Sequence, residues 1–357
     1  MKIHLIYPVL LLTLMNCSQN KPTIPLYIGT YTDGDSEGIY RLQFNTETGE
    51  LSDKQLAANS SNPSYITYSP DRTYLYAVNE NDPGEVSGYK IKTDGTLDLI
   101  NAVSSEGAHP CHISINKTGD VAVVSNYTSG TVSLFSINEN GVLNNAYQVF
   151  NHNAPDSISH AHSAQFFKDQ LYVSDLGRNA VYNYQLTSNK KNYELITPSI
   201  IPMPEHVGPR HFALTNDGQF IYIIDEYGNS ITSAKQVNGK FEPLEHVSTL
   251  RDDFKGESNC ADIHLSKDET FVYGSNRGEN TIVVFKRNTQ TGTLEKIQNE
   301  DVHGDWPRNF TLDPTGKFLL VANKKSNNIS VFKIDQNTGK LSFLNSTDLP
   351  TPVCLLF

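Results

Sequence analysis

Ionisable side chains recur at three equivalent positions of a segment that the chain repeats about every fifty residues. The first position is occupied in turn by Ser64, Cys111, His162, Arg210, Ala261 and Arg308. The next position is occupied by Tyr65, His112, Ser163, His211, Asp262 and Asn309. The third position, further along each copy, is occupied by Glu80, Tyr127, Leu176, Glu226, Arg277 and Lys324. The framework of the repeat is kept while these positions vary, which favours a binding or catalytic site over a purely structural repeat.

The residue types at these positions indicate acid–base and electrostatic chemistry on an anionic ligand. The planar fork of arginine matches a carboxylate or a phosphate, so Arg210, Arg277 and Arg308 favour an anion. Glu226 beside arginines would stay ionised and could act as a general base. His162 or His112 could donate to a developing oxyanion or move a proton. The alternative to a functional site is a solvated rim of paired charges.

Two sequence motifs for other kinds of chemistry are missing. The chain contains no H-E-x-x-H and no phosphate-binding G-x-x-x-x-G-K segment. We therefore expect a reaction that uses no cofactor. We also expect no metal, because strand alternation would turn His112 away from Cys111 and leave no three-ligand set.

The repeat itself predicts the elements that position these side chains. Its copies begin 47, 51, 48, 51 and 47 residues apart, at Asn62, His109, His160, Gly208, Asn259 and Trp306. Each copy has short runs of alternating apolar residues separated by turns rich in Gly, Pro, Asn and Asp, which is the pattern of strands and hairpins. Four short strands in forty to fifty residues make one blade of a β-propeller.

A seventh copy is divided between the two ends of the chain. Residues 25–51 carry later strands of the repeat but lack its first strand, and residues 351–357 resemble that missing strand. Pairing the two ends in one blade would close the ring and cover two sheet edges. We therefore predict an all-β, seven-bladed propeller that forms a single domain over residues 25–357.

Composition restricts the partners. The 357 residues carry a net charge of −11, which disfavours nucleic-acid binding because that needs a basic surface. Cys111, Cys260 and Cys354 have no disulfide or metal-ligand spacing and are expected to be buried small hydrophobes. We expect a monomer whose partner is a small anionic molecule.

The first residues differ from the repeat. Residues 1–16 contain one lysine and then an apolar run, which is typical of a signal peptide. The run ends in Leu14-Met15-Asn16-Cys17, which looks like a bacterial lipobox. We therefore expect a lipidated Cys17, a tether over residues 17–24 and a location in the cell envelope, with the membrane contacted only through the lipid. The alternatives are an N-terminal strand or a start-site artefact, with a cytoplasmic protein.

Several motifs, in order along residues 25–357, resemble those of the lactonase family of seven-bladed propellers. They are YIGTYT from Tyr27, GIYRLQFNTETGEL from Gly38, HPCH from His109, HAHSA from His160, GPRH from Gly208, SNRG from Ser275, WPRNF from Trp306 and the terminal PVCLLF. The family includes propeller-type 6-phosphogluconolactonases and the fungal carboxy-cis,cis-muconate cyclase. The resemblance implies four catalytic residues, with His160 as the alternative for the histidine: His162, Arg210, Glu226 and Arg277.

The resemblance also implies a reaction, the hydrolysis of a sugar lactone such as 6-phosphoglucono-δ-lactone. Arg210 and Arg277 would clamp the anion and polarise the lactone carbonyl, Glu226 would be the base for water, and His162 would donate a proton or orient a group. Further substrate-binding residues would be His112, Tyr127, Arg308, Asn309 and His160. An envelope location would favour an unphosphorylated or carboxylated lactone. A lactonising cyclase and a non-catalytic, ligand- or glycan-binding propeller are the other hypotheses.

Overall fold

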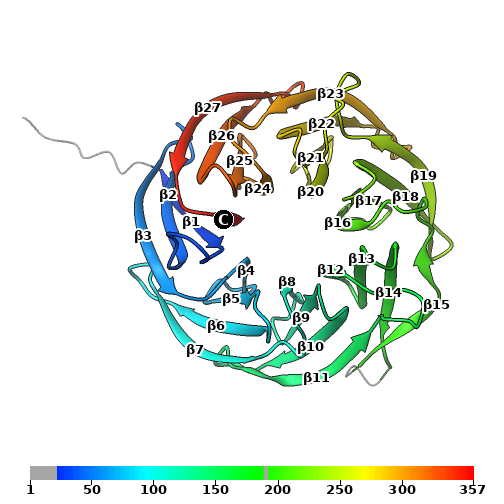
Figure 1. The fold of residues 1–357 in the computed structure, drawn as a ribbon, viewed down its shortest axis with the longest axis horizontal. Coiled ribbons are helices and arrows are strands. Elements are labelled where there is room, and N and C mark those ends of the chain that lie inside the picture. The colour runs from blue at the N-terminus through cyan, green and yellow to red at the C-terminus, as the bar shows by residue number, and fades with distance from the viewer. Residues whose placement is uncertain (1–21, 189–191) are drawn as a thin grey trace, which may run out of the picture.

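The computed structural model describes residues 22–188 and 192–357 as seven four-stranded antiparallel sheets arranged around a central axis (Figure 1). This confirms the predicted all-β, seven-bladed propeller. The predicted signal peptide and Cys17 lie outside the described residues. Within the described part of the chain, no helix is long and apolar enough to cross a membrane.

Each blade presents one strand to the central axis and places a second strand behind it (Figure 1). The innermost strands are β4 (Tyr65–Tyr68), β8 (Pro110–Ile115), β12 (Ala161–Phe167), β16 (Pro209–Leu214), β20 (Asn259–Leu265), β24 (Pro307–Leu312) and β28 (Pro352–Leu356). The second strands are β5 (Tyr74–Asn79), β9 (Val121–Asn126), β13 (Gln170–Asp175), β17 (Phe220–Asp225), β21 (Phe271–Arg277), β25 (Phe318–Asn323) and β1 (Thr23–Thr30).

The other two strands of each blade lie toward the outside of the ring. The third strands are β6 (Glu85–Ile91), β10 (Thr131–Ile137), β14 (Ala180–Leu186), β18 (Ser230–Val237), β22 (Thr281–Arg287), β26 (Asn328–Ile334) and β2 (Gly38–Asn45). The outermost strands are β7 (Leu97–Ser104), β11 (Leu143–Asn151), β15 (Tyr193–Ile201), β19 (Lys240–Ser248), β23 (Leu294–Asp301), β27 (Leu341–Asp348) and β3 (Leu51–Asn59).

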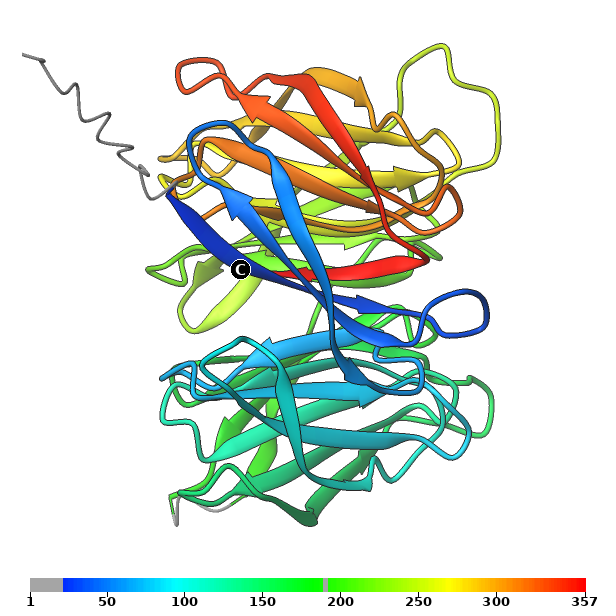
Figure 2. The same cartoon turned by 90° about the vertical axis from the view of Figure 1, so that its left-hand side faces the viewer.

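The two ends of the chain share one blade, as predicted. Its strand order is β28-β1-β2-β3, and β28 pairs with β1 antiparallel so that Tyr27 opposes Leu356 and Gly29 opposes Cys354. Figure 2 shows the C-terminal strand lying against β1. The closing pair covers both sheet edges, which keeps the ring of blades closed.

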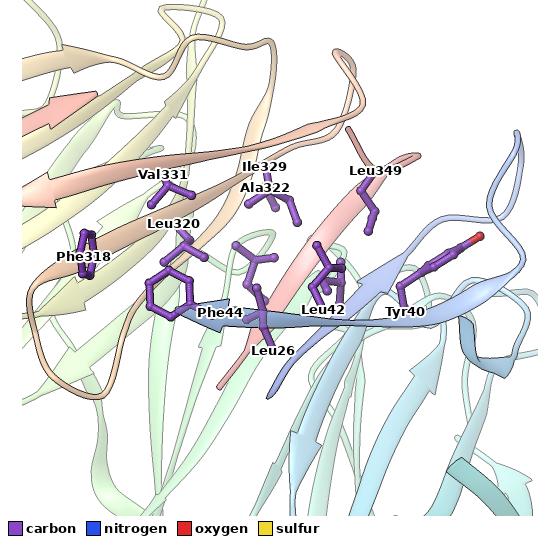
Figure 3. Close-up of a cluster of buried hydrophobic side chains, with 12 residues drawn as sticks. Leu26, Tyr40, Leu42, Phe44, Phe318, Leu320, Ala322, Ile329, Val331 and Leu349 are labelled. Atoms are coloured by element: carbon purple, nitrogen blue, oxygen red, sulfur yellow. The ribbon is translucent and has the colours of Figure 1, made fainter. Parts of the chain in front are cut away.

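Apolar side chains between neighbouring blades hold the ring together. In the cluster of Figure 3, Leu26, Leu42 and Phe44 of the closing blade pack against side chains of β25 and β26. Phe44 meets Phe318 edge-on, with ring centroids 5.6 Å apart. Burying a side chain of this size contributes roughly 1.5–3 kcal/mol. An apolar cluster of this kind lies between each pair of neighbouring blades, so the ring is held together at every blade contact.

In four pairs of adjacent blades, a tyrosine on the second strand forms a hydrogen bond to the next blade. Its hydroxyl donates to the carbonyl of a glycine in a turn of the next blade. The pairs are Tyr27 with Gly95 (2.7 Å), Tyr76 with Gly141 (3.1 Å), Tyr222 with Gly292 (2.9 Å) and Tyr273 with Gly339 (3.0 Å). These bonds fix each turn against its neighbour while the apolar contacts supply the main burial.

Candidate active site

The end of each second strand is held against the start of the innermost strand of the same blade. In one blade, Glu226 directly follows β17, and its N–H donates to the carbonyl of Gly208 at 2.7 Å. The same backbone bond joins Glu80 to Asn62, Tyr127 to His109, Leu176 to His160 and Lys324 to Trp306. The first and third repeat positions therefore meet at one end of the central axis, as the repeat predicted.

A β-bulge at the top of the innermost strand turns two consecutive side chains toward the axis. Pro209 pairs with Asp225 and His211 with Ile224, so Arg210 has no opposite residue. As a result, Nη1 of Arg210 lies only 3.3 Å from Nε2 of His211. The same register shift leaves Cys111, His162 and Arg308 unpaired. A bulge therefore interrupts the simple alternation on which the predicted opposite facing of Cys111 and His112 was based, because a bulge re-aims a side chain.

Glu226 is the centre of a charged cluster with Arg210 and Arg277 at the mouth of the central channel, which we call the upper cluster. Its Oε2 lies 2.9 Å from Nε of Arg210 and 2.9 Å from Nη2 of Arg277. Burial alone would raise the pKa of Glu226, but Arg277, Arg210 and Arg308 outweigh burial and lower that pKa below its usual value. Glu226 is therefore a carboxylate at neutral pH, held between two guanidinium groups.

Both arginines are fixed by backbone carbonyls as well as by Glu226. Arg277 donates from Nη2 to the carbonyl of Cys260 at 2.7 Å, and Arg210 donates from Nη1 to the carbonyl of Ala261. Burial and the neighbouring Arg277 lower the pKa of Arg210 to about 10, which leaves it charged at neutral pH. Within the described residues, no hydrogen bond is found from Nη2 of Arg210 or Nη1 of Arg277. Each arginine thus keeps one terminal nitrogen for a ligand.

His162 lies beside this cluster as a neutral imidazole. Burial, followed by the charge of Arg210, lowers its pKa well below the usual value. Its ring centroid is 5.8 Å from that of Tyr127 and 5.1 Å from that of His211, and its buried Nδ1 has no partner within the described residues. His160, the alternative histidine, instead stacks on Tyr127 at 4.5 Å. His162 therefore lies beside the cluster with a ring nitrogen that has no partner within the described residues, whereas His160 stacks on Tyr127.

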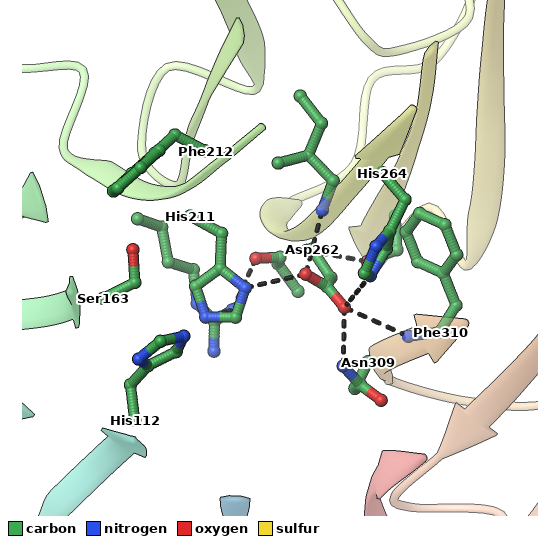
Figure 4. Close-up of polar contacts among 12 residues, drawn as sticks. His112, Ser163, His211, Phe212, Asp262, His264, Asn309 and Phe310 are labelled. Atoms are coloured by element: carbon green, nitrogen blue, oxygen red, sulfur yellow. Dashed lines mark hydrogen bonds and ion pairs between the residues drawn. The ribbon is translucent and has the colours of Figure 1, made fainter. Parts of the chain in front are cut away.

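A second polar layer includes residues of the second repeat position and is organised by Asp262 (Figure 4). One oxygen of Asp262 contacts Nδ1 of His211 at 2.7 Å, and the other contacts Nε2 of His264 at 3.1 Å and accepts from Nδ2 of Asn309 at 2.6 Å. The two histidines keep the pKa of Asp262 well below its usual value despite burial, the largest effect, which acts in the opposite direction. Because Nδ1 of His211 faces Asp262, Nε2 is left to accept from Arg210. Asp262 therefore positions Arg210 through His211.

Two of the predicted substrate-binding residues belong to this second polar layer. Asn309 uses both ends of its amide within the protein, since its Oδ1 also accepts from the backbone of Leu355 at 2.8 Å. The ring of His112 packs on Tyr65 at 4.4 Å. Both line a channel cavity of about 540 Å³ beneath the upper cluster.

The opposite side of the mouth carries Arg308 and a residue that the sequence analysis missed. Tyr31 donates to Oε2 of Glu80 at 2.8 Å, and the same oxygen lies 3.6 Å from Nη2 of Arg308. Tyr31 directly follows β1, the second strand of the closing blade, so it is the seventh member of the third repeat position. Aligning the terminal blade with the other six would have found it.

The sequence analysis also made an expectation for three cysteines. Cys111, Cys260 and Cys354 are free and buried, which confirms the expectation for them. Within residues 22–188 and 192–357, no group of three or more His, Cys, Asp or Glu side chains is arranged to hold a metal ion.

Comparisons with known proteins agree with the fold and the motifs. A family profile described as a seven-bladed β-propeller lactonase matches residues 25–357. The chain is 34% identical to a 6-phosphogluconolactonase of Bacillus subtilis, over 93% of this chain and 97% of that protein. It is also 34% identical to a 6-phosphogluconolactonase of Formosa agariphila, over 84% and 89%. Among solved structures, a periplasmic gluconolactonase of Pseudomonas aeruginosa is 30% identical and aligns with a TM-score of 0.89 over 93% of this chain and 98% of that one.

Proposed function

Since the chain belongs to the lactonase family of seven-bladed β-propellers, we propose that it hydrolyses 6-phosphoglucono-δ-lactone to 6-phosphogluconate. The observation that carries the proposal is the contact of one carboxylate oxygen of Glu226 with two guanidinium groups at 2.9 Å each. This arrangement supplies an ionised group that can accept a proton beside cations that can stabilise an oxyanion. Lactone hydrolysis needs both.

The reaction follows from these positions. Water attacks the lactone carbonyl carbon while Glu226 accepts one of its protons. The free terminal nitrogens of Arg210 and Arg277 donate to the carbonyl oxygen, which becomes an oxyanion in the tetrahedral intermediate. Collapse of the intermediate breaks the bond between the carbonyl carbon and the ring oxygen. The ring oxygen takes up the proton that Glu226 accepted from water, either directly or through neutral His162, which donates its N–H and accepts that proton at its other ring nitrogen, and the product carboxyl group then ionises.

Arg210 and Arg277 take part both in stabilising the oxyanion and in setting the proton affinity of Glu226, the base for water. In the free enzyme they hold Glu226 ionised and thereby weaken it as a base, because a low pKa means a low proton affinity. As negative charge develops on the substrate oxygen, the guanidinium groups interact with that charge as well. Their hold on Glu226 then weakens and its proton affinity rises while it receives the proton from water.

A second substrate has its own support. The Pseudomonas aeruginosa relative is named a gluconolactonase, without a phosphate, and a periplasmic one. The lipobox-like sequence before Cys17 leads us to propose a lipid-anchored position in the cell envelope for this chain also. Glucono-δ-lactone is therefore the alternative substrate. Replacing Cys17 with serine should release the protein from the membrane fraction if the anchor exists, whereas unchanged fractionation would argue against it.

The test of the function is a direct comparison of lactones. The purified protein is mixed with 6-phosphoglucono-δ-lactone or glucono-δ-lactone, and ring opening above the spontaneous rate is measured. A higher kcat/KM for the phosphorylated lactone supports the proposal, and a higher value for glucono-δ-lactone selects the alternative. Turnover of neither lactone by the folded protein would contradict both.

A further inference from the structure

Two cations at the mouth lie apart from the group formed by Glu226, Arg210 and Arg277. Arg308 stands at the bulge of β24, and Lys324 follows β25 of the same blade. Both contact the ring of Tyr31 in the closing blade: the guanidinium carbon of Arg308 is 5.3 Å from the ring centroid, and Nζ of Lys324 is 4.4 Å from it. The two positive groups therefore converge on one side of the channel mouth.

Arg308 differs from the other two arginines in how its donors are used. Arg210 and Arg277 donate to backbone carbonyls and reach Glu226 at 2.9 Å. Arg308 donates no hydrogen bond to any residue that the structure describes, although only 17% of its side chain is exposed. Its one ion pair among the described residues is the 3.6 Å contact with Glu80, whose oxygen already accepts from Tyr31. A largely buried guanidinium with unused donors is costly unless a ligand supplies acceptors.

Lys324 is in a similar position. Its ammonium has no ion pair or hydrogen bond to the part of the chain that the structure describes, apart from its contact with the Tyr31 ring. Burial, followed by the charge of Arg308, lowers the pKa of Lys324. Lys324 is thus a half-buried cation held beside another cation, an arrangement that an anion between them would stabilise.

The charge balance of the mouth agrees with a dianionic ligand. Four cations, Arg210, Arg277, Arg308 and Lys324, face two carboxylates, Glu80 and Glu226, which gives a net charge of +2. Lys325 and Asp33, two exposed charged residues that act on Lys324, cancel each other. The chain as a whole carries −11, so this end of the channel is a local positive region that attracts an anion.

We propose that Arg308 and Lys324 form a phosphate subsite, distinct from the arginines that contact Glu226, and that this subsite makes the enzyme prefer a phosphorylated lactone. The inference rests on the proposed lactonase function and assigns its specificity. Arg308 offers the planar fork that binds two phosphate oxygens, and Lys324 offers a point charge to the third. From the sequence we expected Arg210 and Arg277 both to bind the anionic group and to polarise the lactone carbonyl. In this proposal Arg210 and Arg277 polarise the carbonyl, and Arg308 and Lys324 bind the phosphate.

The test compares two substrates in matched variants. Arg308→Gln and Lys324→Gln should each lower kcat/KM for 6-phosphoglucono-δ-lactone about tenfold to a hundredfold, because each removes a charge-assisted contact. The same variants should change kcat/KM for glucono-δ-lactone by less than about threefold. Lys333→Gln, which removes one positive charge from an exposed position of β26, serves as the control and should alter neither value. Equal losses on both substrates, or no loss on the phosphorylated one, would overturn the subsite.

A binding measurement keeps the subsite testable apart from turnover. Trp306 is the one tryptophan of the chain, and its ring lies 5.4 Å from the guanidinium of Arg277 at the mouth, so its fluorescence can report ligand binding. We expect 6-phosphogluconate to bind more tightly than gluconate, and Arg308→Gln to abolish that difference. An unchanged difference would contradict the subsite. A wild-type protein that opens glucono-δ-lactone without preferring the phosphorylated form would overturn the subsite and leave the lactonase intact, whereas opening of neither lactone would overturn the lactonase.

Discussion

Arg210 and Arg277, which come from neighbouring blades, reach the same carboxylate oxygen of Glu226, each at 2.9 Å. The two contacts place two positive charges directly beside one base at the mouth of the channel. It also means that neither arginine can be replaced without changing the electrostatic state of Glu226.

Replacing Arg210 by lysine should disable the site although the charge is kept. A lysine has one nitrogen and cannot contact Glu226, the carbonyl of Ala261 and a substrate oxygen together. We expect kcat/KM to fall about 10²-fold or more, as for the loss of an oxyanion donor. Arg72→Lys, at an exposed turn, is the matched control. A kcat/KM within about threefold of wild type for Arg210→Lys would show that its fork is not needed.

The pH profile should report the depressed pKa of Glu226. Activity requires the carboxylate, so kcat/KM should stay level on acidification until the pH falls below the usual range for glutamate. Arg277→Gln removes the largest of the charges that lower this pKa, and the acid limb of its residual activity should move to higher pH. Product formation can be followed directly by NMR across the range. Coincident acid limbs in the two proteins would contradict the assignment of Glu226.

Buried neutral histidines should make the fold sensitive to acid. Burial lowers the folded-state pKa of His112, His162 and His211, to about 4 for the last. The unfolded chain therefore binds more protons, and stability present above about pH 6.5 is lost as the pH falls toward the folded values. Each histidine contributes a slope of about 1.4 kcal/mol per pH unit.

Asp225, with its pKa raised to about 7 by burial, acts in the opposite direction, so the decisive quantity is a difference between variants. His112→Gln should reduce the pH dependence of the free energy of unfolding between pH 6 and 5, measured by denaturant titration. His109→Gln, at a partly exposed position, is the control. Parallel dependences in wild type and His112→Gln would contradict the buried neutral state.

The tyrosine hydrogen bonds between blades should contribute modestly to stability. Tyr273→Phe removes the hydroxyl that donates to the carbonyl of Gly339 at 3.0 Å and keeps the ring. We expect the free energy of unfolding to fall by about 0.5–1.5 kcal/mol, with activity unchanged. Tyr147→Phe, on a residue that is 38% exposed, should have no comparable effect. Equal stability of Tyr273→Phe and wild type would show that water satisfies this carbonyl.

The features that recur in every repeat could be predicted from the sequence, whereas contacts that depend on the exact position of individual side chains could not. The blade count and the closing strand followed from the fifty-residue period, and Arg210, Glu226 and Arg277 followed from their equivalent positions. The pairing of His211 with Asp262 could not be predicted, because a bulge sets the facing of both side chains and alternation fails there. Tyr31 was missed because its blade is divided between the chain ends. The difference between Arg308 and the other arginines exists only in their contacts.

The most direct test of the account is Glu226→Gln, with turnover and binding measured on the same preparation. Glutamine keeps the shape of the side chain and can still accept from the arginines, but it cannot take a proton from water. The account predicts that kcat for 6-phosphoglucono-δ-lactone falls at least about 10²-fold, while the affinity for 6-phosphogluconate, read from Trp306 fluorescence, is retained. A variant that binds the product and keeps wild-type turnover would contradict the central claim that Glu226 activates water.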